Sequence, residues 1–356
     1  MKEQNPHPDT FPPVALTSPL PQPSGRGKAI SGRGPELGEF ELIARLCAHL
    51  PRPRGVVLGP GDDCAILAAS PKPQLITIDS MVEGVHFKLE WGTPAMLGAR
   101  ALTVNLSDIA AMGGSPTVAV INLAIRPGLG TKFFDELYRG LGKAAVAAGV
   151  AVAGGNITRA SELAITVALL GEVEGQAMRR DSARPGDKIY VTGTVGDAAL
   201  GLRILQNKTA AAGSARDYLV KRFLQPTARV TAGRKLARIK PSPAAIDISD
   251  GVWQDLGHVL ERSGLGAKLD GTALPLSAAY RQVYGDTSDL AHSGGDDYEL
   301  LFCLHGRMSE AELSRRLGVK VRCIGEITRE KRALLMNGAG EPAIVRNQGW
   351  DQLRAT

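Results

Sequence analysis

The sequence predicts an α+β protein built from two domains, and three observations support this. The chain has 356 residues, more than the roughly 250–300 at which a single hydrophobic core stops growing. Apolar runs of strand length alternate with segments of helical spacing along most of it. A polar, turn-forming stretch, "RRDSARPGD" at 179–187, interrupts this pattern near the middle. We therefore expect one domain over 36–175 and a second over 176–350.

Residues 1–35 are expected to form a disordered tail. This segment holds eight of the 22 prolines and few apolar residues, a composition that buries too little apolar surface to offset the entropy of ordering. It lacks the continuous apolar stretch of a signal peptide. Ordered structure is predicted to begin at "GEFELIARLCAHL" (38–50), whose apolar residues have helical spacing.

The first domain is predicted to combine strands with two long helices. Thr93 and Pro94 mark one helix start, since threonine is a favoured N-cap and proline suits the first helical position. Gly113-Gly114 marks the end of this helix. An amphipathic helix is expected over 131–148. The predicted strands, each an apolar run, are 74–84, 117–125, 149–156 and 163–173.

The second domain shows the same mixture of elements. Its strands are predicted at "KIYVTGTVG", "AAIDISDG", "ELLFCL" and "KVRCIGEI". Helices are expected at 197–206 and 217–237, and a third over 252–264 directly after "AAIDISDG".

Composition excludes several classes of function. Aromatic residues make up only 4%, which argues against a stacking platform for single-stranded nucleic acid. The four cysteines form no CxxC pair, so neither a zinc site nor a disulfide framework is indicated, and a reducing cytoplasm fits. No apolar run approaches the ~18 residues of a membrane span. The net charge of +6 is typical of a solvated basic face or of a surface that attracts an anionic substrate.

Acidic residues recur where buried strands end. In "GPGDDCAIL", Asp62 and Asp63 follow glycine, which is typical of a solvated turn or of a ligand pair. In "TIDSMVEGVHF", Thr77 and Asp79 share one strand face, and Asp79 is expected at the carboxyl end of its strand. His86 follows seven residues later and is either a packed histidine or a binding residue.

Two further aspartates occupy positions that should be apolar. Asp108 shares a helical stripe with Leu97, Ala101 and Val104, so its charge needs a cation or a buried hydrogen bond. In "AIDISDG", Asp247 and Ser249 face the same way from one strand. Asp250 has the plainer interpretation of an N-cap to the following helix.

Together these oxygen donors indicate hard divalent cations such as Mg²⁺, with phosphate supplying the remaining ligands. That combination predicts phosphoryl transfer. The sequence has no GxxxxGK[ST] loop and no HRD or DFG set, so a kinase here requires another scaffold.

The chain resembles thiamine-monophosphate kinases, of the superfamily that includes aminoimidazole ribonucleotide synthetase. The resemblance runs from "GEFELIARL" to "GWDQL" and leaves out the tail. It rests on motifs in the family's order and spacing: "GPGDDCAIL", "TIDSMVEGVHF", "ALTVNLSDIAAMGGSP", "GGNITR", "RPGDKIYVTGTVGDAALGL", "AIDISDGVWQDLGHV" and "SGGDDYELLF". It implies an N-terminal mixed sheet with helices that dimerises through its strands and a C-terminal α/β sandwich.

The resemblance also implies an activity. This is Mg²⁺-dependent, in-line transfer of the ATP γ-phosphoryl group to thiamine monophosphate, giving thiamine diphosphate, by a cytoplasmic homodimer without nucleic-acid or membrane partners. No dedicated base is implied, because the acceptor phosphate is already anionic, and Arg180 adds positive charge.

The family's site residues map onto this sequence as follows. The implied metal ligands are Asp63, Thr77, the backbone of Ile78, Asp79, Asp108, Asn156, Asp247 and Asp250. The implied ATP contacts are Gly155, Asn156, Arg180 and Ser249, and the implied substrate contacts are His86, Asp296 and Trp350. Two positions depart from the family pattern: Asn156 stands where aspartate is usual, and Asp296 where glutamate is frequent.

Two other functions are compatible with parts of this pattern. The same scaffold supports ring-closing ATP chemistry and selenophosphate synthesis, but the latter needs a reactive cysteine near the N-terminus, and the tail has none. A nucleotide-binding protein without turnover, altered at Asn156, is the alternative from another class.

Overall fold

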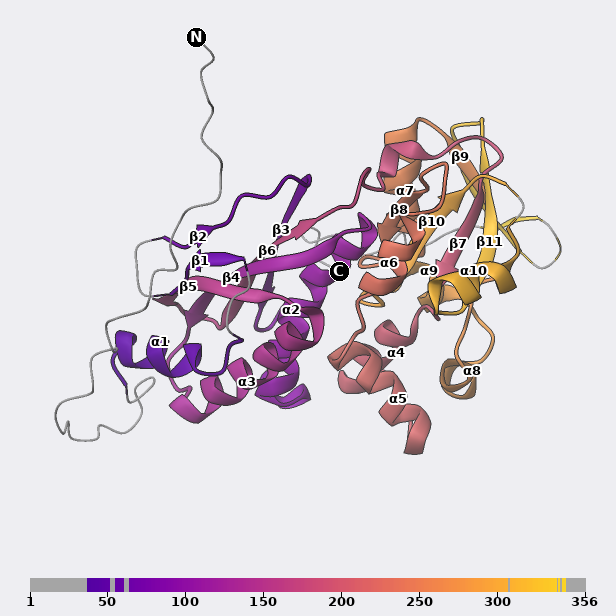
Figure 1. The fold of residues 1–356 in the computed structure, drawn as a ribbon. Coiled ribbons are helices and arrows are strands. Elements are labelled where there is room, and N and C mark those ends of the chain that lie inside the picture. The colour runs from indigo at the N-terminus through magenta and orange to yellow at the C-terminus, as the bar shows by residue number, and fades with distance from the viewer. Residues whose placement is uncertain are drawn as a thin grey trace, which may run out of the picture.

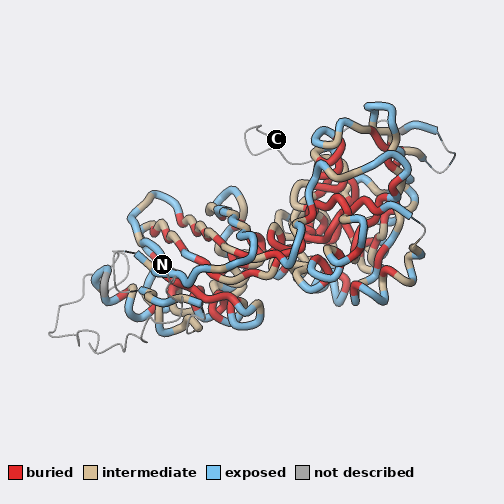
Figure 2. The backbone as a smooth tube through the Cα atoms, turned by 45° about the horizontal axis from the view of Figure 1, so that its top comes forward, coloured by how far each residue is buried: buried red, intermediate tan, exposed pale blue. Residues whose placement is uncertain are grey.

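The computed structural model describes residues 37–51, 55–60, 64–306, 308–337, 339 and 341–343. The predicted tail, Asp62, Asp63 and Trp350 lie outside the described residues. The described chain forms two lobes, each with its own concentration of buried residues (Figures 1 and 2). This agrees with the α+β class, and the division at 175/176 stays a proposal.

The N-terminal lobe is built on a four-stranded mixed sheet with the order β3-β6-β4-β5. β6 is antiparallel to both β3 and β4, whereas β5 is parallel to β4. In chain order its elements are α1 (Glu39–Cys47), β1 (Val56–Leu58), β2 (Ile66–Leu67), β3 (Gln74–Val82), η1 (Leu89–Trp91), α2 (Pro94–Ala111), β4 (Ser115–Ile125), α3 (Thr131–Ala148), β5 (Ala151–Arg159) and β6 (Ala164–Glu172).

The predicted helix signals of this lobe are confirmed. The Thr93 side chain accepts a hydrogen bond from the Met96 amide at 3.3 Å, and Pro94 is the first residue of α2. α3 spans the predicted 131–148 and ends on Gly149 in the left-handed conformation that glycine favours. β3 extends three residues past Asp79, so this aspartate lies within its strand and not at the expected end.

The C-terminal lobe is built on a seven-stranded sheet with the order β13-β12-β9-β11-β7-β10-β8. Its helices are α4 (Asp197–Leu205), α5 (Gly213–Leu224), α6 (Val230–Leu236), α7 (Val252–Ser263), α8 (Ala278–Tyr284), α9 (Asp289–Ser293) and α10 (Glu310–Leu317), after a short η2 (Arg180–Ser182). Its strands are β7 (Lys188–Thr192), β8 (Ala244–Asp247), β9 (Gly266–Asp270), β10 (Leu300–Leu304), β11 (Val321–Thr328), β12 (Ala333–Met336) and β13 (Pro342–Ala343).

One helix prediction in this lobe is wrong. The single helix expected over 217–237 is two helices, α5 and α6, separated by 225–229. Pro226 lies in this break, and proline both lacks an amide proton and clashes with the preceding turn of a helix.

Helix α2 connects the two lobes. Most of its buried residues pack with α3 against the N-terminal sheet. At its carboxyl end, Ala110 and Ala111 belong instead to a core cluster with Met178, Leu236 and Phe302. α2 also contacts β8 and α6. Side chains near residue 108 are therefore placed at the junction of the lobes.

The face of the N-terminal sheet opposite α2 and α3 is largely uncovered. Ile76 and Ile78 of β3 are 78% and 65% exposed there. The β1–β2 hairpin packs only on one end of this face, near Val118 and Leu170. A polar row crosses the face at one register: the Ser80 and Thr166 hydroxyls lie 2.7 Å apart, and Asn156 Nδ2 donates to Asn122 Oδ1 at 2.9 Å.

Within the described part of the chain, no helix combines the length and apolar character that crossing a membrane requires.

Glycine permits the close packing of α2 on α3. A Cβ added at Gly140 would lie 1.9 Å from the Ala95 carbonyl oxygen, and one at Gly98 would lie 2.0 Å from that of Leu137. Real contacts are never this short, so the backbones approach as they do only because these side chains are missing.

We expect Gly140→Ala to destabilise the protein, because the two helices must separate to admit a methyl group, at a cost of about 1–3 kcal/mol. Gly257→Ala is the matched control: this glycine is also in a helix, but its added Cβ meets nothing within 4 Å. The control should be neutral or slightly stabilising, since alanine is the better helix former. Urea unfolding of both variants checks this, and equal midpoints would contradict it.

Candidate active site

Carboxylates from both lobes converge at the junction that α2 forms. β3 contributes Asp79, α2 contributes Asp108, and the end of β8 with the following turn contributes Asp247 and Asp250. Thr77 faces the same way as Asp79 and donates its hydroxyl to Asp108 Oδ2 at 2.5 Å. The strand alternation that placed Thr77 and Asp79 together in the sequence is thus confirmed.

The negative charges of these clustered carboxylates repel one another. Desolvation, together with the charges of Asp108 and Asp250, raises the pKa of Asp79 to about 6. Complete burial and the charge of Asp108 raise the pKa of Asp247 to about 7. Burial also raises the pKa of Asp108, although the Thr77 hydroxyl and the charge of Arg180 oppose the rise. Among the described residues, the protein therefore compensates these carboxylates only in part.

Asp250 does not serve as the expected N-cap. The residue that caps α7 is Gly251, and the backbone amides of Asp250 and Gly251 both donate to Asp255 Oδ2 at 3.1 Å. Asp255 is buried, and burial followed by the charges of Asp247 and Asp250 raises its pKa well above the usual value. Ligand atoms of Asp250, Asp255 and His258 lie within 4.8 Å of one another, a spacing that suits a metal ion.

Arg180 is a cation whose charge acts on the carboxylate cluster. It is exposed, begins η2, and acts electrostatically on Asp108. Its carbonyl oxygen accepts a hydrogen bond from Ser263 Oγ at 2.9 Å, which ties η2 to the end of α7. The role of Arg180 in holding ATP stays a prediction.

The predicted substrate residues His86 and Asp296 lie together at another part of the junction. Arg100 of α2 joins them: Nη2 donates to Asp296 Oδ1 at 2.9 Å, and Nη1 donates to the His86 carbonyl oxygen at 3.3 Å. His86 Nδ1 accepts from the Val82 amide at 3.0 Å, so a neutral His86 carries its proton on Nε2. Asp296 also donates its amide to the Ser249 carbonyl oxygen at 2.8 Å, which links a predicted substrate contact to a predicted ATP contact.

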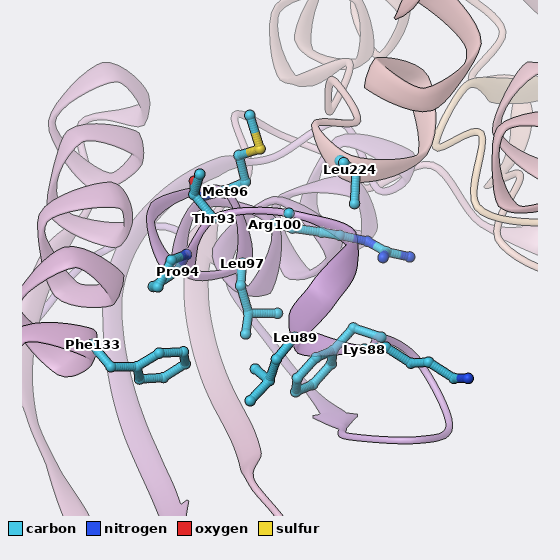
Figure 3. Close-up of a pocket in the computed structure, with 11 residues that line it drawn as sticks. Lys88, Leu89, Thr93, Pro94, Met96, Leu97, Arg100, Phe133 and Leu224 are labelled. Atoms are coloured by element: carbon cyan, nitrogen blue, oxygen red, sulfur yellow. The ribbon is translucent and has the colours of Figure 1, made fainter. Parts of the chain in front are cut away.

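An apolar pocket is lined in part by Arg100 and by Phe87, the residue that follows His86. Leu89, Leu97 and Phe133 group on one side of it, and Lys88 and Arg100 extend on the other (Figure 3). Leu224 from the C-terminal lobe completes the lining, so this pocket too is shared by both lobes.

The structure does not bring Asn156 and Gly155 to the carboxylates of the same chain. Asn156 and its partner Asn122 lie on the open face of the sheet, whereas Asp79 faces α2. β5, which carries Gly155 and Asn156, is also separated from β3 by two strands. Their assignment to metal and ATP stays a prediction, as does that of Asp63 and Trp350, which lie outside the described residues.

The sequence interpretation missed a buried ionic network in the C-terminal lobe. Asp297 is fully buried and accepts hydrogen bonds from the amides of Gly196 and Ala198, at the start of α4. Glu299, also fully buried, accepts from Arg222 at 3.1 Å, from Arg229 and from the Thr192 hydroxyl at 2.7 Å. The available signal was Glu299 itself, an acidic residue that opens the apolar run "ELLFCL".

Comparison with known proteins shows to which family the chain belongs. Residues 61–173 match the model of the AIR synthase related protein, N-terminal domain. The chain is 40% identical over 328 residues to a thiamine-monophosphate kinase of Escherichia coli strain K12, with 88% of this chain and 98% of the relative covered. The chain belongs to the thiamine-monophosphate kinase family. A kinase of Bacillus subtilis strain 168 is 35% identical, with 74% and 82% covered.

Solved structures of thiamine-monophosphate kinases share the fold. The Stenotrophomonas maltophilia enzyme aligns with a TM-score of 0.76 at 37% identity, with 86% of this chain and 98% of that chain covered. AaThiL complexed with AMPPCP and TMP aligns with a TM-score of 0.70 at 32% identity, with 89% and 98% covered. Escherichia coli HypE aligns at 20% identity with a TM-score of 0.72, which shows that the scaffold extends beyond thiamine-monophosphate kinases.

Proposed function

We propose that this protein phosphorylates thiamine monophosphate to thiamine diphosphate with ATP and Mg²⁺. The observation that carries the proposal is the convergence of Asp79, Asp108, Asp247 and Asp250 from two lobes, with Arg180 beside them and raised pKa values at the first three. The kinases at 35–40% identity over most of the chain, and the relative complexed with AMPPCP and TMP, support this substrate pair.

The residues present fit several Mg²⁺ ions. Their donors are carboxylate and hydroxyl oxygens, the ligands that Mg²⁺ prefers. Asp63, Thr77, the Ile78 backbone, Asp79, Asp108, Asn156, Asp247 and Asp250 remain the proposed metal ligands. When bound, Mg²⁺ would neutralise phosphate charge that would otherwise keep ATP and thiamine monophosphate apart.

The remaining residues position two anionic substrates for direct in-line transfer. Arg180 and Ser249 are proposed to hold ATP at the acidic cluster. His86, Asp296 and Trp350 are proposed to hold the acceptor. No general base is required, because the acceptor phosphate oxygen already carries negative charge near neutral pH. Catalysis is then largely positioning and electrostatic stabilisation.

Purified protein should convert thiamine monophosphate and ATP to thiamine diphosphate and ADP only when Mg²⁺ is present. Asp108→Asn should lower kcat by at least about 100-fold, the scale of losing one electrostatic stabiliser. Its melting temperature should not fall, because the substitution removes a desolvated charge that Asp247 opposes.

Product chromatography measures this, with Asp286→Asn as the matched control: Asp286 is 87% exposed and forms a surface ion pair with Arg281. ADP formation without thiamine diphosphate would contradict the proposed substrate. If the wild-type protein binds nucleotide but turns over neither substrate, the result would favour a nucleotide-binding protein over a kinase.

Stabilisation by Mg²⁺ should increase with pH. The folded-state pKa values of Asp79 and Asp247, about 6 and about 7, exceed the unfolded value of about 3.8. Without metal, these groups therefore cost stability as pH rises from about 4 to about 7, because the unfolded chain loses its protons first. Metal binding removes that cost and requires the deprotonated form.

The rise in melting temperature on adding Mg²⁺ should accordingly be larger near about pH 8 than near about pH 5.5. Differential scanning calorimetry with and without Mg²⁺ checks this. Asp247→Asn should reduce the pH dependence, and an Mg²⁺ effect that is equal at both pH values would exclude these carboxylates as ligands.

We also propose that the protein is a homodimer formed through the open face of its N-terminal sheet. Ile76, Ile78 and Val120 are exposed on this face at 78%, 65% and 38%. A group of exposed large apolar side chains on one sheet face indicates an interface.

Ile76→Lys should shift the protein toward monomer, because a charged side chain would have to be desolvated in the interface. Val146→Lys is the matched control: Val146 is 65% exposed, but it lies on α3, against the other face of the sheet. Light scattering after size-exclusion chromatography measures the mass. A monomeric wild type, or a dimer that persists in Ile76→Lys, would contradict the proposed dimer.

A further inference from the structure

Arg100 is a buried cation that belongs to one lobe and contacts the other. Its side chain is 4% exposed. It donates to the His86 carbonyl oxygen within its own lobe and to Asp296 Oδ1 in the C-terminal lobe. Its guanidinium carbon lies 4.1 Å from the centre of the Phe223 ring of α5, a distance at which the ring attracts the cation.

The hydrogen bonds to Asp296 all reach one oxygen of its carboxylate, Oδ1. Oδ1 accepts from Arg100 at 2.9 Å and from the Tyr298 hydroxyl at 3.0 Å. In the part of the chain that the structure describes, no donor reaches Oδ2. Asp296 also has a left-handed φ of +67°, and its amide is held by the Ser249 carbonyl oxygen. The protein thus holds one oxygen and leaves the other for a ligand.

Helix α2 relates this carboxylate to the acidic cluster. From α2, Arg100 donates a hydrogen bond to the C-terminal lobe, and Asp108 acts electrostatically on Asp247 of that lobe. Arg100 and Asp108 are eight residues apart, which corresponds to about 12 Å along a helix axis. Because both residues belong to one continuous helix, α2 fixes the spacing between the Arg100 contact with Asp296 and the Asp108 carboxylate.

We propose that Arg100 is a positioning residue that sets where the acceptor is held relative to the carboxylate cluster. It acts by orienting Asp296 and the His86 segment, not by touching the reacting atoms. This inference rests on the proposed function, in which Asp296 and His86 contact the acceptor. The competing explanation is a purely structural ion pair that joins the lobes without affecting substrate selection.

Kinetics of Arg100→Met separate the two explanations. This variant keeps much of the apolar stem but loses both hydrogen bonds. We expect kcat/KM for thiamine monophosphate to fall by at least about tenfold, while the KM for ATP changes by less than about twofold, because only the acceptor side loses a buried charge partner. Arg100→Lys keeps the charge but loses the planar, two-donor geometry, so an intermediate loss is expected.

Arg45→Met is the matched control. Arg45 makes a two-hydrogen-bond ion pair with Asp135 between α1 and α3, and none of the site residues that the structure describes bonds to this pair. Neither KM should change in this variant. Equal effects of Arg100→Met on both substrates, or a lower melting temperature with unchanged kinetics, would overturn the positioning role. If Arg100→Met does not fold, a normal acceptor KM in Arg100→Lys would overturn it.

Crystal structures of wild type and Arg100→Lys provide a readout that does not depend on the substrate. We expect the Asp296 carboxylate to rotate or shift in the variant, and an unmoved segment 294–298 would overturn the inference. The proposed function fails separately, if wild-type protein forms no thiamine diphosphate.

Discussion

The site depends on one unfavourable interaction, the repulsion among desolvated carboxylates at the junction of the two lobes. Desolvating an ionised carboxylate is costly, and placing others beside it increases that cost. The fold maintains the arrangement because α2 is anchored at both ends, by the N-terminal core and by the cluster that contains Ala110 and Ala111. The same repulsion that opposes folding favours a cation, since the ion removes it on binding.

A second acidic group, Glu299 and Asp297, shows how buried carboxylates bond to other parts of the C-terminal lobe. Glu299 is as buried as any residue, yet it accepts bonds from two arginines and a hydroxyl. Asp297 accepts hydrogen bonds from two backbone amides at the start of α4, and its Oδ1 lies 4.0 Å from Arg222 Nη2, yet burial still raises its pKa to about 8. The cluster around Asp108 has a single exposed arginine nearby and no comparable set of donors among the described residues. The contrast with the donor set of Glu299, more than acidity or a raised pKa, distinguishes a candidate ligand site from a structural ion network.

The sequence predicted the local features well and the long-range ones only through the family resemblance. The α2 cap, the bounds of α3 and the shared face of Thr77 and Asp79 follow from side-chain chemistry and from helix and strand periodicity. The break between α5 and α6 was missed, although Pro226 signalled it. Arg100 was missed because its hydrogen-bond partner Asp296 is 196 residues away in the sequence. Periodicity gave no indication that these two residues meet across the junction.

The doublet Asp296-Asp297 shows how adjacent carboxylates avoid one another. A left-handed φ of +67° at Asp296, which aspartate tolerates better than most residues, turns the chain so that neighbouring side chains take different partners. Asp297 binds the amides at the start of α4, where the helix dipole favours negative charge. Asp296 turns to Arg100 and Tyr298 instead. One residue therefore anchors the loop in the C-terminal lobe, and its neighbour is presented to the N-terminal lobe. The position of the loop and the orientation of the Asp296 carboxylate are consequently set together.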